Sequence, residues 1–265
     1  MAINLANHNV CEYRRNRKEQ WCDTIAPFYS ITYNRNRLYY ICACRKRIYN
    51  KERKIQKKME LTMKKIVRNF ILAVLGGAAI GIGGIVYLSL EQKIIGALLF
   101  TAGLYTICLH GLNLYTGKVG YAVNQPLSYF ADLLVIWAGN LCGTACAAFA
   151  VRQTRVQDIS EKAAAMCETK LRDSYLSLFL LAVFCGFLMY VAVDGYKNSK
   201  NPLILFTGVS VFILCGFEHC IADMFYFSVS KTWSVHSFCC IVVITLGNSA
   251  GAVLIPFAKK LYADL

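Results

Sequence analysis

The chain has 265 residues, of which 57% are hydrophobic, and its mean hydropathy is +0.43. That is more apolar surface than a soluble domain of this length needs, which excludes an ordinary soluble globular protein. The formal net charge of +14 is uneven, because residues 1–58 hold 14 Lys or Arg residues and only 4 Asp or Glu residues. This basic segment fits the cytoplasmic flank of a membrane domain better than a nucleic-acid interface.

Residues 1–58 have no hydrophobic period and no apolar core of a signal peptide. We predict that this segment is a disordered N-terminal extension, and that Met59 or Met63 begins the functional sequence. The alternative interpretation is an arm that binds nucleic acid or lipid headgroups. The predicted domains are therefore the extension over 1–58 and a membrane domain over 59–265.

Six apolar segments follow, each near the roughly 20 residues that a helix needs to cross a bilayer. They begin near residues 66, 94, 129, 175, 203 and 235, and the last ends near residue 257. Polar residues interrupt the second segment at 110–118 and the fifth at 218–219, and such breaks require protein or water around the exposed backbone. The pattern predicts an all-α, multi-pass membrane protein with six transmembrane helices, of which helices 2 and 5 are broken.

A short glycine motif recurs in the two halves of this region. Gly139-Asn140 with Gly143 is repeated as Gly247-Asn248 with Gly251, at an offset of 108 residues. The same offset carries His219 to position 111, inside the other interruption. The two halves therefore read as three-helix repeats, and an odd number of spans makes the repeats inverted in the membrane.

Lys and Arg residues beside the helix ends indicate the orientation. With six spans, the start of the first helix and the ends of the fourth and sixth helices lie on the same side of the membrane. Basic residues flank these three ends: Lys64, Lys65, Arg68, Lys197, Lys200, Lys259 and Lys260. This pattern puts both termini in the cytoplasm. The polar connection at 152–173 disagrees with this orientation. It holds five Lys or Arg residues on the predicted outer side, whereas such residues are usually more frequent in cytoplasmic loops.

The fifth segment holds three ionisable residues, Glu218, His219 and Asp223. An ionised side chain at this depth costs on the order of 2.5–3.5 kcal/mol, so such residues usually face a cavity or a pathway. Alternatively, Glu218 and His219 satisfy each other within the bundle. An integral-membrane enzyme is a weaker alternative. Glu218 and His219 are adjacent in sequence, so on a regular helix their side chains point about 100° apart instead of converging on a metal ion.

The 13 cysteines form no Cys-x-x-Cys pair and have no histidine at zinc-like spacing. Seven lie in apolar runs, where a thiol behaves as a small hydrophobe. We therefore expect neither a disulfide framework nor a metal site, and no cofactor.

The motif Gly216-Phe217-Glu218-His219-(x)3-Met224-Phe225 resembles that of the formate/nitrite transporter family. Gly139-Asn140, Thr245-Leu246-Gly247-Asn248 and Leu114-Tyr115-Thr116 support the resemblance, which covers the chain from about Met63. It implies a homopentamer of aquaporin-like six-helix protomers in the cell membrane, each with its own pore and with cytoplasmic termini.

The resemblance also implies roles for individual residues. The pore or substrate positions are His219 at the centre, its neighbour Glu218, Lys170 near the outer mouth, Thr116, Asn140 and Asn248. The constrictions are Phe100 and Phe212 on the outer side and Leu104 and Leu114 on the inner side, with Met189 in place of a smaller aliphatic residue. Read from the sequence alone, Lys170 could instead pair with Glu168 or Asp173, and the two Phe residues could be ordinary packing.

Four residues depart from the family pattern. Gly186 stands where the formate channel has an asparagine, Cys220 and Asp223 replace residues that are usually Ser and Asn, and Lys118 adds a charge near the inner vestibule. These departures concern the substrate rather than the class of protein.

The function expected is passive or proton-coupled transport of small monovalent anions: formate, nitrite or hydrosulfide. Lys170 would attract the anion, the apolar rings would strip its water, and His219 would either donate a proton or bind it as an imidazolium. The alternative is an aquaporin-like pore for small neutral solutes, although the chain lacks Asn-Pro-Ala motifs. A purely structural or signalling protein would leave the matched helix breaks unexplained.

Overall fold

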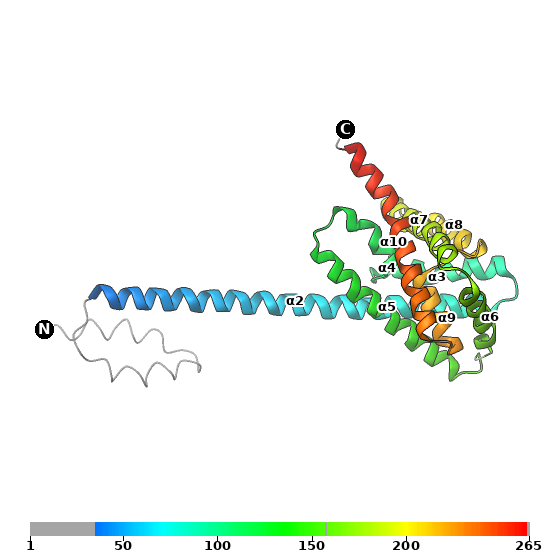
Figure 1. Cartoon of the computed structure of the whole chain (residues 1–265), viewed down its shortest axis with the longest axis horizontal. Helices are drawn as coiled ribbons and strands as arrows, with labels where there is room; N and C mark the ends of the chain where they lie inside the picture. Colours follow the sequence, from blue (N-terminus) through cyan, green and yellow to red (C-terminus); the bar gives the residue numbers. More distant parts are fainter. Residues whose placement is uncertain (1–34, 157, 264–265) are drawn as a thin grey trace. The chain divides into compact units, whose positions relative to one another are not determined.

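The computed structural model describes residues 35–156 and 158–263, with side chains from residue 48 onward. Every element in these ranges is helical (Figure 1). The elements are α2 (Arg35–Ser89), α3 (Lys93–His110), α4 (Tyr115–Lys118), the 3-10 helix η2 (Val119–Asn124), α5 (Ser128–Arg152), α6 (Ile159–Arg172), α7 (Tyr175–Ser199), α8 (Leu203–Leu214), α9 (Cys220–Ser230) and α10 (Val235–Ala263). The chain divides into two compact units, Met1–Glu60 and Leu61–Leu265.

Helix α2 begins well before the first apolar segment. Residues 35–58 are helical, whereas we expected disorder over 1–58. No Gly or Pro occurs between Arg35 and Leu75, and Lys, Arg, Glu and Gln are good helix formers, so nothing local stops the helix. The rest of that expectation falls on residues 1–34, outside the described part of the chain.

Five helices among the described residues are long and apolar enough to cross a membrane. They lie within Ile48–Ser89, Lys93–His110, Ser128–Arg152, Tyr175–Ser199 and Val235–Ala263. Two shorter apolar helices, α8 with 12 residues and α9 with 11, would each extend about 16–18 Å. That is roughly half of a hydrocarbon core of about 30 Å, so the two are long enough to cross it only together.

Both apolar segments that we expected to be interrupted are broken. Residues 111–114 separate α3 from α4, and residues 215–219 separate α8 from α9. Each preceding helix ends at a left-handed glycine, Gly111 (φ 62°) and Gly216 (φ 68°). The next residue then bonds back into the helix, from the Leu112 amide to Ile107 at 3.0 Å and from the Phe217 amide to Phe212 at 2.9 Å. The two helices therefore end in the same kind of C-terminal turn.

The glycine motifs mark close contacts between helix backbones. A Cβ on Gly143 of α5 would lie 2.0 Å from the carbonyl oxygen of Val74 on α2. On Gly251 of α10 it would lie 1.9 Å from that of Val183 on α7. Only glycine permits helices to approach this closely, which is how small residues act in membrane helix packing.

The connection at 152–173, which we expected to be merely polar, contains helix α6. Its buried residues Ile159, Ala163, Cys167 and Lys170 recur at spacings of four, four and three, and so lie on one face of the helix. This face packs against α9. A charged residue therefore sits in the buried stripe of an otherwise polar helix.

Candidate functional site

The imidazole of His219 is held in the interior by hydrogen bonds at both ring nitrogens. His219 is the N-cap of α9, and its Nδ1 accepts a hydrogen bond from the Ala222 backbone amide at 3.1 Å. Its Nε2 lies 2.9 Å from Oγ1 of Thr116, in the first turn of α4. Because Nδ1 accepts, a neutral ring carries its proton on Nε2 and donates it to Thr116. The residue is 2% exposed, so the ring does not face the lipid side of the bundle.

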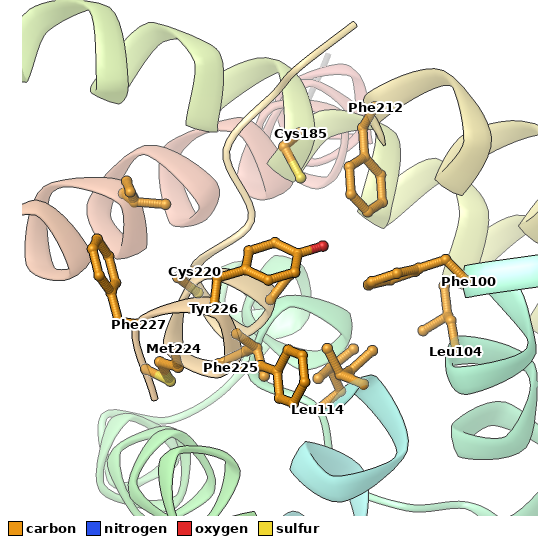
Figure 2. Packing of buried hydrophobic residues seen from close by; sticks show 14 of the residues in the cluster. Phe100, Leu104, Leu114, Cys185, Phe212, Cys220, Met224, Phe225, Tyr226 and Phe227 are labelled. Atoms are coloured by element: carbon orange, nitrogen blue, oxygen red, sulfur yellow. The ribbon is translucent and has the colours of Figure 1, made fainter. Parts of the chain in front are cut away.

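Aromatic rings lie directly against this imidazole. Phe212 stacks on His219 with ring centroids 5.5 Å apart and planes 13° apart. Phe100 meets Phe212 edge-on at 6.4 Å, and Figure 2 shows the two reaching toward each other from α3 and α8. The predicted outer constriction residues are therefore in contact with each other and, through Phe212, with the predicted central residue.

The predicted inner constriction residues belong to the same buried cluster. Leu104 lies one helical turn after Phe100 on α3, Leu114 precedes α4 immediately, and Met189 lies on α7. Each is only 1% exposed. The structure thus gathers all five predicted constriction residues in one apolar core, in which Leu104 and Leu114 lie near Phe100 in Figure 2.

Asn140 and Asn248 each form hydrogen bonds to the backbone at one helix break. We call this set of hydrogen bonds a clasp. The Asn140 amide donates to the carbonyls of Ala73 and Asn113, both at 2.8 Å, and its Oδ1 accepts from the Tyr115 amide at 2.9 Å. Because both amide hydrogens are engaged with backbone and the side chain is fully buried, this geometry gives Asn140 a structural role at the break.

Asn248 repeats this clasp at the second break. It donates to the carbonyls of Ala182 at 2.9 Å and Glu218 at 2.8 Å, and its Oδ1 accepts from the Cys220 amide at 2.9 Å. Both breaks are thus held by an asparagine from a long helix farther along the chain, α5 for the first break and α10 for the second.

The matched contacts correct the alignment of the two breaks. Asn113 corresponds to Glu218 and Tyr115 to Cys220, so the partner of His219 is Leu114 and not position 111. The offset of 108 residues, which relates Asn140 to Asn248, does not relate the two breaks, because the number of residues between each break and its asparagine differs. Asn140 follows its bonded amide by 25 residues and Asn248 follows its own by 28. One break therefore presents a leucine where the other presents the histidine.

Lys170 joins Glu218 and Asp223 in a buried ionic cluster, which we call the Lys170 cluster. Its Nζ pairs with Oε2 of Glu218 and lies 3.0 Å from Oδ1 of Asp223. The three residues are 9%, 5% and 1% exposed, in that order. Burial alone would lower the pKa of Lys170, but the attraction of Asp223 and Glu218 outweighs it and raises the pKa above its ordinary value. Lys170 therefore stays charged.

These contacts exclude two alternative pairings. Glu168 pairs with Arg172 at 2.5 Å, and Asp173 accepts from Ser177 Oγ at 2.7 Å, so neither holds Lys170. Glu218 and His219 also have separate partners, as described above, instead of satisfying each other.

Two departures from the family pattern have a physical explanation. A Cβ on Gly186 would lie 2.1 Å from the carbonyl oxygen of Asn248, so an asparagine cannot occupy this position without moving α7 from α10. Asp223 is a member of the Lys170 cluster.

The other two departures, Cys220 and Lys118, lie near the two breaks. Cys220 is fully buried, and its amide donates a hydrogen bond to Asn248. Lys118 is half-buried at the end of α4.

The Lys170 cluster was only partly visible in the sequence. The family motif marks Asp223 as a departure, and nothing in the local sequence pairs it with Lys170. The signal that could have found it is the buried stripe of α6, because the spacing from Ile159 to Lys170 turns the lysine toward the bundle. Within the described ranges, no group of three His, Cys, Asp or Glu residues is placed to hold a metal ion.

Comparisons with known proteins agree with this architecture. The family model for "Formate/nitrite transporter" matches residues 48–262. The transporter YrhG of Bacillus subtilis, described as uncharacterized, is 26% identical over 207 residues, which is 67% of this chain and 77% of that protein. The formate channel FocB of Escherichia coli is 24% identical over 181 residues, covering 59% of this chain and 64% of the channel.

Solved structures share the fold. A pentameric formate channel with formate bound superimposes with a TM-score of 0.63 at 24% identity, over 76% of this chain and 99% of that one. An ion channel of the FNT family gives a TM-score of 0.66 at 20% identity, over 77% and 92%. The chain belongs to the formate/nitrite transporter family. It is therefore a membrane protein with several apolar helices, from a family of channels and transporters.

Proposed function

We propose that the chain carries small monovalent anions, namely formate, nitrite or hydrosulfide, through a pathway inside each protomer that passes His219. The observation that carries this proposal is the placement of the imidazole. A helix break presents it deep in an apolar bundle, stacked on Phe212 and hydrogen-bonded to Thr116. Membership of the formate/nitrite transporter family supports the same conclusion.

The chemistry of the pathway follows from the cost of dehydration. An anion that leaves water among Phe100, Phe212 and Leu104 loses hydration worth several kcal/mol unless it finds a hydrogen-bond donor. The Nε2–H of His219 and the hydroxyl of Thr116 are donors at that depth. A small anion that displaces their mutual hydrogen bond would regain part of the lost hydration.

The capping bond of His219 bears on the choice between binding and proton transfer. A neutral imidazole can donate a hydrogen bond from Nε2 while Nδ1 remains bonded to the Ala222 amide. An imidazolium carries a proton on Nδ1 as well, so the ring would have to release that amide first. We therefore favour hydrogen bonding by the neutral ring over protonation of the anion, and proton coupling becomes the secondary route.

We further propose six spans arranged as two inverted three-helix repeats, with both termini in the cytoplasm and five protomers in the assembly. The five long apolar helices and the α8–α9 pair account for six crossings. The clasps of Asn140 and Asn248 on equivalent breaks support the repeat. The pentamer rests on the structural relative, a pentameric formate channel.

The test is a flux comparison with the full chain reconstituted in liposomes. Uptake of radiolabelled formate, nitrite, hydrosulfide and lactate is measured at two pH values, together with water permeability. We expect uptake of at least one small anion well above that of protein-free vesicles, with lactate slower than formate. Raised water permeability without uptake of any of these anions would favour the neutral-solute pore and contradict the proposal.

A further inference from the structure

The Lys170 cluster contains one more carboxyl group than its cation can neutralise. Lys170 contacts both Glu218 and Asp223. With both acids ionised, the cluster would carry a net charge of −1 in the interior of the protein, where an uncompensated charge is strongly unfavourable.

A second observation concerns a particular oxygen atom. Oδ1 of Asp223 binds Lys170, but its Oδ2 is fully buried and has no hydrogen-bond donor among the described residues. The carboxyl groups of Glu218 and Asp223 lie close together, because both contact the same atom, Nζ of Lys170. Two carboxylates cannot bond to each other, because both are acceptors, whereas a carboxylic acid and a carboxylate can. One proton between them would remove the excess charge and satisfy the orphan oxygen together.

We propose that Glu218 and Asp223 hold one proton between them at neutral pH, so that Lys170 faces one carboxylate and one carboxylic acid. The proton is taken up from the solvent and forms an O–H bond on one carboxyl group. That group then donates a hydrogen bond to the other, which remains a carboxylate. Like charges brought together in a dry site characteristically share a proton in this way. The pair, and not either residue alone, then titrates.

In the part of the chain whose side chains the structure describes, no other charged group contacts Asp223. The groups that face this part of α9 are Cys167 of α6, Cys185 of α7, Cys240 of α10, Cys220 and Tyr226 of α9 itself, and Arg152 of α5. Thiols and phenols are uncharged at neutral pH. Arg152 binds the carbonyl oxygen of Ser228, more than one helical turn beyond Asp223. Lys170 thus remains the cation that contacts the two acids.

The bound proton has a consequence for transport that rests on the proposed function. When the pair loses its proton at alkaline pH, the Lys170 cluster becomes net negative beside His219. A negative cluster repels anions, so we expect anion flux to fall as the pair deprotonates. Asparagine at position 223 removes this titration, because its amide can donate to Glu218 without a proton being bound.

The primary test is infrared spectroscopy of the full chain in lipid bilayers. Wild type at neutral pH should show the C=O stretching band of a buried protonated carboxylic acid, which shifts in D2O and disappears at alkaline pH. Asp223→Asn should abolish the band, because Glu218 is then ionised against Lys170. Glu168→Gln is the matched control, since its carboxylate is exposed and pairs with Arg172, and it should leave the band unchanged.

Two outcomes would overturn the proposal: a wild type without the band at neutral pH, or an Asp223→Asn variant that retains it. The wild-type titration decides the question even if the variant does not fold. Formate flux is measured on the same preparations. Flux that falls at alkaline pH in wild type but not in Asp223→Asn supports the consequence for transport, whereas equal pH profiles contradict it. Because the band is read without transport, absence of flux would count against the proposed function alone.

Discussion

His219 uses its two ring nitrogens for different purposes. Nδ1 caps α9 and fixes the orientation of the ring, and Nε2 is the atom that meets Thr116 and would meet a substrate. The hydrogen bonds of the Asn248 side chain go to backbone groups of Glu218 and Cys220, on either side of His219, and to the Ala182 carbonyl on α7. The histidine is therefore the side chain available for chemistry, and the asparagine holds it in place.

The clasp of Asn248 predicts a large loss of stability when it is removed. Asn248→Ala leaves the Cys220 amide and the carbonyls of Glu218 and Ala182 without this partner. Each buried group that stays unpaired costs about 1–3 kcal/mol. Thermal unfolding in detergent should show a clearly lower melting temperature than for Asn198→Ala, which removes an exposed bond to Asp194. Equal melting temperatures for the two variants would show that the clasp does not stabilise the break.

At the scale of elements, the two helix breaks determine where polar groups enter the apolar bundle. Each break needs a left-handed residue to end the preceding helix and an asparagine to bind the backbone released there. These are ordinary means of satisfying backbone groups where no water is present. The matched hydrogen bonds place Leu114 and His219 at the same position relative to Asn140 and Asn248, one residue before the amide that each asparagine binds.

Replacing Gly216 tests the conformation of the second break. No atom lies within 4 Å of a Cβ added there, so the penalty comes from the positive φ alone. Gly216→Ala should cost about 1–2 kcal/mol, and Gly216→Asn less, because asparagine tolerates the left-handed region. Melting temperatures should therefore fall in the order Gly, Asn, Ala. An alanine variant as stable as wild type would contradict the left-handed geometry.

Replacing Gly186 tests the contact between α7 and α10 by a different mechanism. Here a Cβ would collide with the Asn248 carbonyl oxygen at 2.1 Å. Overpacking of this kind typically costs about 1–3 kcal/mol, and it would also disturb the clasp. Gly117→Ala is the control, since its nearest neighbour is Val193 Cγ2 at 3.5 Å. We expect Gly186→Ala, but not Gly117→Ala, to melt at a lower temperature; similar values would mean that the helices are farther apart.

The sequence was sufficient for the features that depend on local composition. The apolar segments were predictable because spanning a bilayer requires long runs of apolar residues, and the breaks because polar residues interrupt two of these runs. The expectation that His219 is the central pore residue came from the motif around it, and it stays a prediction. The register between the breaks was not predictable, because it depends on a difference of three residues in the distance to each clasp.

Contacts that depend on the path of the chain could not be predicted in the same way. Lys170 lies 48 residues before Glu218, and only the docking of α6 on α9 brings them together. The helical residues 35–58 were missed for another reason. A basic composition indicates solvent exposure but does not distinguish an exposed helix from a disordered segment.

At the scale of the whole molecule, the membrane unit exposes many large apolar side chains. Examples are Leu134 on α5, Leu176 on α7 and Leu203 on α8, all more than 60% exposed. Such a surface requires lipid or neighbouring subunits to cover it. If the assembly resembles that of the pentameric relative, native mass spectrometry from mild detergent should give five times the protomer mass of 29.7 kDa. A spectrum dominated by monomers or dimers, with lipid retained, would contradict the pentamer.

The measurement that tests the central claim most directly is anion flux through liposomes that contain His219→Phe. The phenyl ring fills the same space but can neither cap α9 nor donate to Thr116 or to an anion. His110→Phe is the control, because His110 is exposed at the end of α3. Flux of formate and nitrite is followed between about pH 5 and pH 8, where a histidine can change charge.

We expect His219→Phe to lower the flux at least tenfold, equivalent to about 1.4 kcal/mol in the barrier, or to change its selectivity and pH dependence, while His110→Phe behaves as wild type. Wild-type flux, selectivity and pH dependence in a folded His219→Phe protein would contradict a pathway that passes this residue.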